Sequence, residues 1–358
     1  MSDSDAARDV VQANPVPRHD TPDVVSVNQT HAPYTFGIDV GGTGIKIGLV
    51  DRDGRTVHYE KIPTRADEGA DDAVARIGRC CHAAGDTLGI TGDIVAAGVG
   101  APGPMDLKRG TLVSPPQLPT WWGFNLRDAI ASATGLPVTF LNDANAAAYG
   151  EYWLGSGRDD NSMVMLTLGT GVGGGIIVED LLINGENSCG SECGHMVIDP
   201  SPTAELCHWG GGRGQLEAYA SASAVVARTR RRLTEGAESL LKDHLIGGNA
   251  ELTAYQVYRA AVDGDALALE IVDETARWLG IGVTSLVYAI DPGSVVLGGA
   301  MDFGGADDPI GQRFIAGVRD EFVSRVFPAV SEGTTIQFAS LGGHAGYIGV
   351  AGYARRSR

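Results

Sequence analysis

The stretch from Phe36 to Asp51 constrains the fold more than any other part of the chain. An alternating apolar run leads into the glycine-rich segment Gly41 to Gly44, and a second apolar run follows it. Two such runs around a glycine-rich turn predict a β-hairpin. Glycines let backbone N–H groups approach a bulky anion closely. We therefore interpret the turn either as an ordinary tight hairpin or as a loop that binds phosphate.

A second copy of the same layout favours the phosphate-binding interpretation. Residues Met163 to Asp180 again show an apolar run, a turn at Gly169-Thr170-Gly171, a second apolar run and an acid. Two Gly-Thr-Gly hairpins far apart in the sequence indicate two related halves that hold one phosphate chain between them. In the first copy, Thr43 adds a hydroxyl and Lys46 adds a positive charge, and both groups suit phosphate oxygens.

The length and net charge of the chain indicate how many domains it can form and which partners are excluded. With 358 residues the chain is long enough for two domains, each with a sizeable core. A net charge of −17 argues against sequence-independent nucleic-acid binding, so we expect no nucleic-acid partner. Phosphorylated ligands remain compatible, because a local lysine and a metal ion can reverse the sign of the charge at one site.

The sequence also bears on location. No apolar run approaches the length of a membrane span, and the N-terminus lacks a basic segment followed by an apolar core. The five cysteines follow no regular framework, which points to a reducing cytoplasm. We therefore expect a cytoplasmic protein with no membrane partner.

Helical and strand patterns alternate along the chain. Residues 1–33 are polar, with prolines and no apolar period, and we expect a disordered tail there. Apolar periodicity and turn signals then predict both element types. Helices are predicted over 71–88, 125–134, 144–154, 267–290, 310–326 and 346–355, and strands over 94–100, 138–141, 294–297 and 335–339. This alternation predicts an α/β protein.

Glycines follow two of the predicted strands. Ligands bind at the carboxyl ends of strands in open α/β sheets. Gly103 lies in the turn after the strand over 94–100, where it either touches substrate or serves only the turn. Gly298 and Gly299 follow the strand over 294–297 and mark a third place where backbone can approach a ligand.

Two polar residues stand between the strand over 138–141 and the helix after it. Asn142 and Asp143 end the strand, and strong helix formers follow. Taken alone, Asp143 is best explained as the N-cap of the helix, a position that Asp favours. The same placement suits a carboxylate that accepts a proton from a substrate hydroxyl.

A loop after the second hairpin carries Glu192 and His195, separated by a cysteine and a glycine. This spacing lets two polar groups point at one ligand, and a surface loop or a helix cap is the alternative. Nearby cysteines and histidines have the composition of a metal site, but their spacing fits no paired zinc pattern.

Together these motifs resemble the ROK family of repressors and sugar kinases, within the superfamily of actin, Hsp70 and hexokinase. The resemblance runs from about Tyr34 to the C-terminus. It implies an α/β, two-domain actin-like ATPase fold, which is ribonuclease H-like, with a ligand cleft between the domains. We expect a small domain from residues 34–136 plus 344–358 and a large domain from residues 137–343.

The resemblance also implies a role for each motif. Asp143 corresponds to the catalytic base, and the matching sugar contacts are Asn142, Asp143, Glu192, His195 and Glu217, to which the position of Gly103 adds one more. The family's phosphate loops match Gly41, Gly42, Thr43, Lys46, Gly169, Thr170 and Gly171. Gly298, Gly299 and residues 341–348 would flank the adenosine, and Asp39 would face Mg²⁺ through water.

The activity implied is ATP-dependent phosphorylation of a hexose, with ATP and Mg²⁺ as cofactors. Residues 115–121, followed by 125–127, are most similar to the glucokinase members, so glucose at its 6-hydroxyl is the expected substrate. Another hexose or an N-acetylhexosamine, and polyphosphate as donor, stay open. The family suggests a homodimer or a homotetramer.

Three functions other than a sugar kinase are alternatives for a chain with these motifs. A ROK repressor carries an N-terminal DNA-binding domain, against which the acidic charge and the short polar tail argue. A sugar-sensing protein without activity would be expected to lose Asp143 or a phosphate loop. A chaperone-like or filament ATPase would lack the sugar-binding residues.

This sequence departs from the family at the structural zinc site. In the family, the zinc is bound by three cysteines and by the histidine that His195 matches. Cys207 matches the first cysteine, but Trp209 and Gln215 stand at the other two positions, with one extra residue in the loop. Because a tetrahedral structural site needs four ligands, we predict no zinc here. We expect packing around Trp209 to hold the loop instead.

Overall fold

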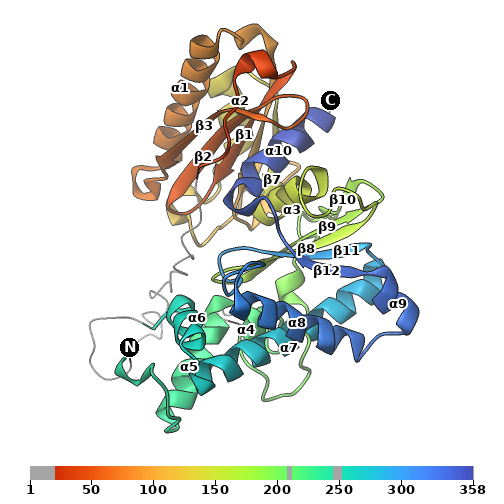
Figure 1. Ribbon diagram of the computed structural model, residues 1–358. Coiled ribbons are helices and arrows are strands. Elements are labelled where there is room, and N and C mark those ends of the chain that lie inside the picture. The colour runs from red at the N-terminus through yellow and green to blue at the C-terminus, as the bar shows by residue number, and fades with distance from the viewer. Residues whose placement is uncertain (1–20, 208–211, 245–251, 358) are drawn as a thin grey trace.

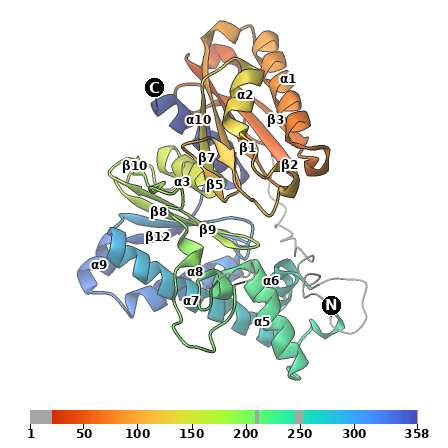
Figure 2. The same ribbon diagram turned by 180° about the vertical axis from the view of Figure 1, so that it is seen from behind.

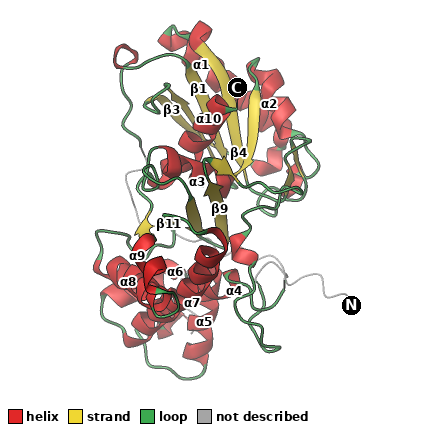
Figure 3. Cartoon of the chain, turned by 90° about the vertical axis from the view of Figure 1, so that its right-hand side faces the viewer, coloured by secondary structure: helices red, strands yellow, loops and turns green. Residues whose placement is uncertain are grey.

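A computed structural model describes residues 21–207, 212–244 and 252–357. Two five-stranded sheets lie one above the other, with helices on their outer faces and two helices between them (Figure 1). Many of the remaining helices gather below the second sheet (Figure 3). The mixed architecture agrees with the expected α/β class.

The first sheet has the strand order β3-β2-β1-β4-β7. Its strands are β1 (Tyr34–Val40), β2 (Gly44–Val50), β3 (Thr56–Pro63), β4 (Ile94–Ala101) and β7 (Val138–Asn142). The first three form an antiparallel meander, while β4 and β7 run parallel to β1. The predicted first hairpin is the β1–β2 pair.

The second sheet repeats this topology in the order β10-β9-β8-β11-β12. Its strands are β8 (Met163–Leu168), β9 (Val172–Val178), β10 (Leu181–Leu182), β11 (Ser294–Gly298) and β12 (Thr335–Phe338). Again three antiparallel strands are followed by two parallel ones. The repeated Gly-Thr-Gly hairpin is therefore part of a repeat of the whole sheet. A separate small ribbon pairs β5 (Met105–Asp106) with β6 (Thr111–Leu112).

Two helices pack between the sheets, α3 (Asp143–Trp153) and α10 (Ala345–Arg356), as Figures 1 and 2 show. The helix α10 packs on the first sheet and α3 packs on β8 and β9 of the second. Their close approach requires glycine, because a Cβ added at Gly349 would lie 1.8 Å from the carbonyl oxygen of Ala146. The outer face of the first sheet is covered by α1 (Ala70–Leu88) and α2 (Leu126–Thr134).

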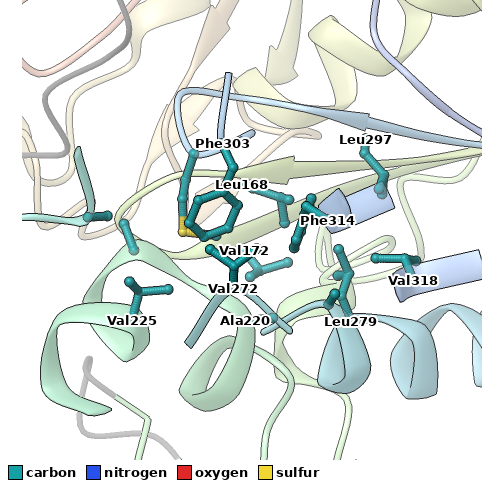
Figure 4. Packing of buried hydrophobic residues seen from close by; sticks show 14 of the residues in the cluster. Leu168, Val172, Ala220, Val225, Val272, Leu279, Leu297, Phe303, Phe314 and Val318 are labelled. Atoms are coloured by element: carbon teal, nitrogen blue, oxygen red, sulfur yellow. The ribbon is translucent and has the colours of Figure 1, made fainter. Parts of the chain in front are cut away.

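The other helices cover the far face of the second sheet. They are α4 (Glu217–Ala220), α5 (Ala222–Thr234), α6 (Ala254–Val262), α7 (Ala266–Ile290), α8 (Pro309–Val323) and α9 (Pro328–Gly333). Figure 4 shows the core that they form, in which Leu168 and Leu297 of the sheet meet Leu279 and Phe314 of the helices. Each such fully buried side chain contributes about 1.5–3 kcal/mol. The helix α7 buries one face along its length, while Glu270, Asp273 and Arg277 on the other face are exposed.

The expectation of a disordered tail is wrong for residues 21–33. The backbone N–H of Val25 donates to the carbonyl of Thr56 at 2.9 Å, and that of His31 donates to the Asp51 carboxylate at 3.1 Å. Val25 and Val27 also pack against the core of the first sheet. The segment is therefore held by backbone hydrogen bonds to Thr56 and Asp51 and by the packing of its two valines. Residues 1–20 lie outside the described part.

The expected division of the chain at residue 137 separates β7 from its sheet. The strand pairs with β4 from Ala97–Val138 to Ala101–Asn142, so a boundary after Asn142 follows the hydrogen bonding better. The assignment of the C-terminal helix to the small domain remains a proposal, supported by its packing on β1. Within the described residues, no helix is both long enough and apolar enough to cross a membrane.

Candidate functional site

The carboxyl ends of β1, β4 and β7 meet at one edge of the first sheet, because the three strands are parallel. Asp39 lies near the end of β1, and Asp143 follows directly after β7. Asn142 caps α3, because its Oδ1 accepts from the N–H of Ala144 at 2.9 Å and of Asn145 at 3.3 Å. The capping role considered for Asp143 thus belongs to Asn142.

The carboxylate of Asp143 has an unusual electrostatic environment. The pKa of Asp143 is raised to about 6, chiefly by burial and then by the negative charge of Asp39, with a smaller effect of Glu192, while the backbone N–H of Ala144 lowers it. Asp143 is therefore under the influence of two other acidic side chains. A carboxylate with a pKa close to neutrality is suited to accept a proton.

Asp39 faces Lys46 across the first hairpin. The two residues are partners in the β1–β2 register, and the Lys46 Nζ lies 3.5 Å from the Asp39 Oδ2. Burial nonetheless raises the pKa of Asp39. Lys46 also donates to the carbonyl of Gly343 at 2.7 Å, just before α10. Lys46 is therefore engaged within the protein, and its contact with phosphate remains a prediction.

In the turn between β1 and β2, hydrogen bonds fix the first residue and the next two residues are exposed. The N–H of Gly41 donates to the carbonyl of Gly44 at 2.9 Å. The hydroxyl of Thr64 donates to the Gly41 carbonyl at 2.6 Å, while Gly42 and Thr43 are exposed. Sequence reasoning missed Thr64, which follows the end of β3 and carries no motif.

The turn between β8 and β9 is fixed to the start of α5. The N–H of Ala222 donates to the carbonyl of Gly169 at 2.8 Å, and the Ser223 hydroxyl donates to the carbonyl of Thr170 at 2.8 Å. The positive end of a helix dipole thus lies beside this turn. Gly299 is close as well: at its φ of +99°, an added Cβ would lie 2.2 Å from the carbonyl oxygen of Leu168. Gly299 and the second turn are therefore brought together.

The residues expected to hold sugar lie on both sides of Asp143 along the chain. A Cβ added at Gly103 would lie 3.4 Å from the Asn142 amide nitrogen, so these two residues are neighbours. The Glu192 Oε2 lies 3.9 Å from the His195 Nε2. The pKa of Glu192 is raised chiefly by burial, which outweighs the effect of His195. Glu192 and His195 thus form a polar pair, as their spacing predicts.

Glu217 lies deeper than expected for a sugar contact. Its side chain is 4% exposed. The Oε2 accepts from the N–H of Val172 at 2.9 Å, and the Oε1 accepts from the Cys207 thiol at 3.0 Å. Glu217 therefore supports the start of β9 and Cys207, and its contact with a sugar remains a prediction.

The loop that would carry zinc in the family is described in part. The His195 Nδ1 lies 3.3 Å from the Gln215 Oε1, and Cys207 is bonded to Glu217. Trp209 falls outside the described residues, so its packing role stays a prediction. Where the structure describes the chain, no group of three metal-ligating side chains includes His195 or Cys207.

A cavity of about 880 Å³ opens at the carboxyl end of β12. Its lining includes Gln337, Ala339 and Ser340, together with Gln312 and Arg319 of α8. The cavity adjoins β11, because a Cβ added at Gly298 would lie 3.0 Å from the Cβ of Ala339. No motif marks the polar residues of α8, so sequence reasoning missed them.

Comparisons with known proteins agree with this architecture. A sequence model of the ROK family matches residues 35–357. A glucokinase of Halalkalibacterium halodurans is 34% identical over 325 residues, which cover 88% of this chain and 93% of that protein.

Two solved structures are similar over 90% of the chain. A ROK hexokinase from Thermus thermophilus has a TM-score of 0.76 at 30% identity, with 98% of that chain covered. A ROK family glucokinase from Streptomyces griseus, in complex with glucose and AMPPNP, has a TM-score of 0.71 at 32% identity, with 99% of it covered.

Proposed function

The chain belongs to the ROK family, and we propose that it transfers the γ-phosphoryl group of ATP to the 6-hydroxyl of glucose. The fold is the two-domain actin-like ATPase fold of the family's sugar kinases. The observation that carries the proposal is the position of Asp143 at the carboxyl end of β7, with its pKa raised to about 6.

Asp143 is the proposed general base. It would orient the attacking hydroxyl and take its proton as the bond to phosphorus forms. Phosphoryl-transfer transition states are loose, so the proton leaves late and a weak base suffices. Because the pKa of Asp143 is raised to about 6, the carboxylate is largely ionised at neutral pH while being a stronger base than an ordinary Asp.

The sugar contacts proposed are Asn142, Glu192 and His195, with Gly103 beside Asn142. A carboxylate accepts hydrogen bonds from several hydroxyls at once, and an imidazole can donate one and accept one, which suits a hexose. The negative charge of Glu192, which helps to raise the pKa of Asp143, supports this grouping. Glu217 would act chiefly through the loop that it supports.

ATP is the proposed donor, held between the two hairpin turns. The exposed Gly42 and Thr43 of the first turn are open to a phosphate. The second turn, at Gly169 to Gly171, has the start of α5 beside it, which favours negative charge. The cavity next to Gly298 has the size and polarity to take the adenosine.

The residues present also fit Mg²⁺. This ion takes carboxylate oxygens together with substrate phosphates and retains several waters. Asp39 is a half-buried carboxylate with 19% of its side chain exposed, and its negative charge acts on a second carboxylate, Asp143. Two acidic groups that interact in this way favour the binding of a cation. When bound, Mg²⁺ would neutralise charge on the transferred phosphates. Asp39 would hold it, through water.

The proposal is tested by a coupled ADP-release assay with Mg-ATP against a panel of hexoses. Glucose is expected to give the highest kcat/KM, and Asp143→Ala should abolish most of the turnover. Highest turnover with another hexose or an N-acetylhexosamine would support the same mechanism but assign a different sugar as the substrate. If calorimetry shows saturable sugar binding but no sugar is phosphorylated with either ATP or polyphosphate as donor, the result would favour a sugar sensor instead.

We also propose that the protein works in the cytoplasm as a homodimer or homotetramer. Light scattering on the purified chain tests the assembly. A monomer at micromolar concentration would contradict it.

A further inference from the structure

Glu151 is a fully buried carboxylate in the last turn of α3, with an exposed fraction of 0%. Its Oε1 accepts from the N–H of Leu341 at 2.7 Å. Its Oε2 accepts from the N–H of Ser156 at 2.8 Å and from both the N–H and the hydroxyl of Ser340 at 3.1 Å. Every donor lies outside α3, so the carboxylate joins this helix to other segments.

The segments that Glu151 joins are the two connections between the sheets. The chain leaves the first sheet through α3 and residues 154–162 to reach β8, and it returns through residues 339–344 to α10. Ser156 belongs to the outgoing connection, and Ser340 and Leu341 belong to the returning one. A single buried carboxylate thus holds both crossing points together.

Further bonds tie the same two connections. The Ser156 hydroxyl donates to the carbonyl of Phe338 at 2.8 Å, and the Gln337 amide donates to the carbonyl of Ser156 at 2.8 Å. Gln337, Phe338 and Ser340 all line the cavity at the end of β12. The wall of this cavity is therefore built from residues that the Glu151 cluster holds.

We propose that Glu151 is a positioning residue that couples the hinge between the two domains to the nucleotide cavity. Two stretches of the chain connect the sheets, α3 with residues 154–162 and residues 339–344 with α10, and residues 154–162 and 339–344 are their non-helical parts, where relative motion of the sheets can bend the chain. Glu151 keeps these two connections in one arrangement and so keeps Ser340 in place on the cavity wall. The inference rests on the proposed use of that cavity for ATP.

The test compares Glu151→Gln with a matched control, Asp265→Asn. Asp265 is also a buried carboxylate that joins separate segments: it accepts from the N–H groups of Ala268 and Leu240 and from the Ser239 hydroxyl. All of these donors lie among the helices that cover the second sheet. In both variants an amide NH₂ replaces an acceptor that faces donors, so both should unfold at lower temperature.

Only Glu151→Gln should change nucleotide use. We expect kcat/KM for ATP to fall at least tenfold in Glu151→Gln and by less than twofold in Asp265→Asn, both assayed well below their melting temperatures. The Kd for glucose by calorimetry should stay within twofold in both, because no expected sugar contact touches either residue. Equal losses of kcat/KM in the two variants would overturn the proposal.

A second readout does not depend on turnover. Small-angle scattering of the wild-type protein, with and without glucose plus AMPPNP, measures the change in shape that accompanies binding. We expect Glu151→Gln to alter this change and Asp265→Asn to preserve it. If the wild-type protein transfers no phosphoryl group, the proposed function is refuted but the role of Glu151 in the hinge is not. If binding changes the scattering of both variants identically, the role of Glu151 in the hinge is refuted.

Discussion

Asp39 and Asp143 stand at the carboxyl ends of two parallel strands of one sheet, and the negative charge of Asp39 raises the pKa of Asp143. Burial has the larger effect on that pKa, and Glu192 adds a smaller one. The site therefore concentrates acid groups where a substrate hydroxyl and a phosphate chain would meet. This arrangement underlies the first two predictions.

Replacing Asp143 with Asn should lower kcat by about 10²–10⁴-fold, the usual contribution of a general base. The substitution keeps the shape of the side chain and removes its ability to accept a proton. The coupled assay measures the loss, and calorimetry should show glucose binding within a few-fold of the wild type. Near-normal turnover would remove Asp143 from the role of base.

The Asp143→Asn variant should also remain folded. The folded pKa of about 6 lies above the ordinary aspartate value of 3.8, so the native state holds the proton more tightly than the unfolded state does. Stability is then lost as the pH rises through this window, and the wild type carries that cost at pH 8. The melting temperature of Asp143→Asn at pH 8 should therefore equal or exceed that of the wild type.

The pH dependence of kcat/KM should show one group with a pKa of about 6. Activity should fall below this pH, because the base must be ionised and protonation removes it. In Glu192→Gln, one of the charges that raise this pKa is gone, so the inflection should move to lower pH. A profile that stays flat down to pH 4.5 would contradict the assignment.

Gly299→Ala should raise the KM for ATP at least about tenfold. The added Cβ would lie 2.2 Å from the Leu168 carbonyl oxygen, which must shift at the end of β8. Gly236→Ala is the matched control, because its φ of +95° imposes a similar backbone strain of about 1–2 kcal/mol but nothing lies within 4 Å of its Cβ. Equal KM values in the two variants would argue against a role of Gly299 in nucleotide binding.

Gln215→Leu should raise the KM for glucose about 2–10-fold and leave the KM for ATP unchanged. The substitution removes the group that meets the His195 Nδ1 at 3.3 Å, and a hydrogen bond contributes about 0.5–1.5 kcal/mol. Arg213→Leu changes the same loop without touching that contact and serves as the control. An unchanged KM for glucose would show that Gln215 does not orient His195.

Metal analysis of the purified protein should find no stoichiometric zinc. Gln215 and Trp209 stand where two cysteine ligands are expected, and a structural site needs four ligands. Dialysis against a chelator should leave the melting temperature unchanged. One zinc per chain would overturn this prediction.

Local pattern alone determined much of this protein. The alternating apolar runs and glycine turns predict both hairpins, and the strand over 138–141 followed by helix formers places Asp143 at a strand end. These features are readable because side-chain periodicity and turn chemistry act over a few residues. The motifs matched to the family add the other proposed ligand contacts, but no motif marks Thr64 or the polar residues of α8.

Tertiary structure decided what depends on residues distant in the sequence. The raised pKa of Asp143 comes from burial and from the charges of Asp39 and Glu192, which are distant in the sequence. The two connections meet at Glu151 because α3 and α10 pack between the sheets. Residues 21–33 are likewise held by tertiary contacts, namely the packing of Val25 and Val27 on the first sheet and hydrogen bonds to Thr56 and Asp51. Burial and long-range hydrogen bonds arise from how the sheets and helices pack, and no local pattern encodes them.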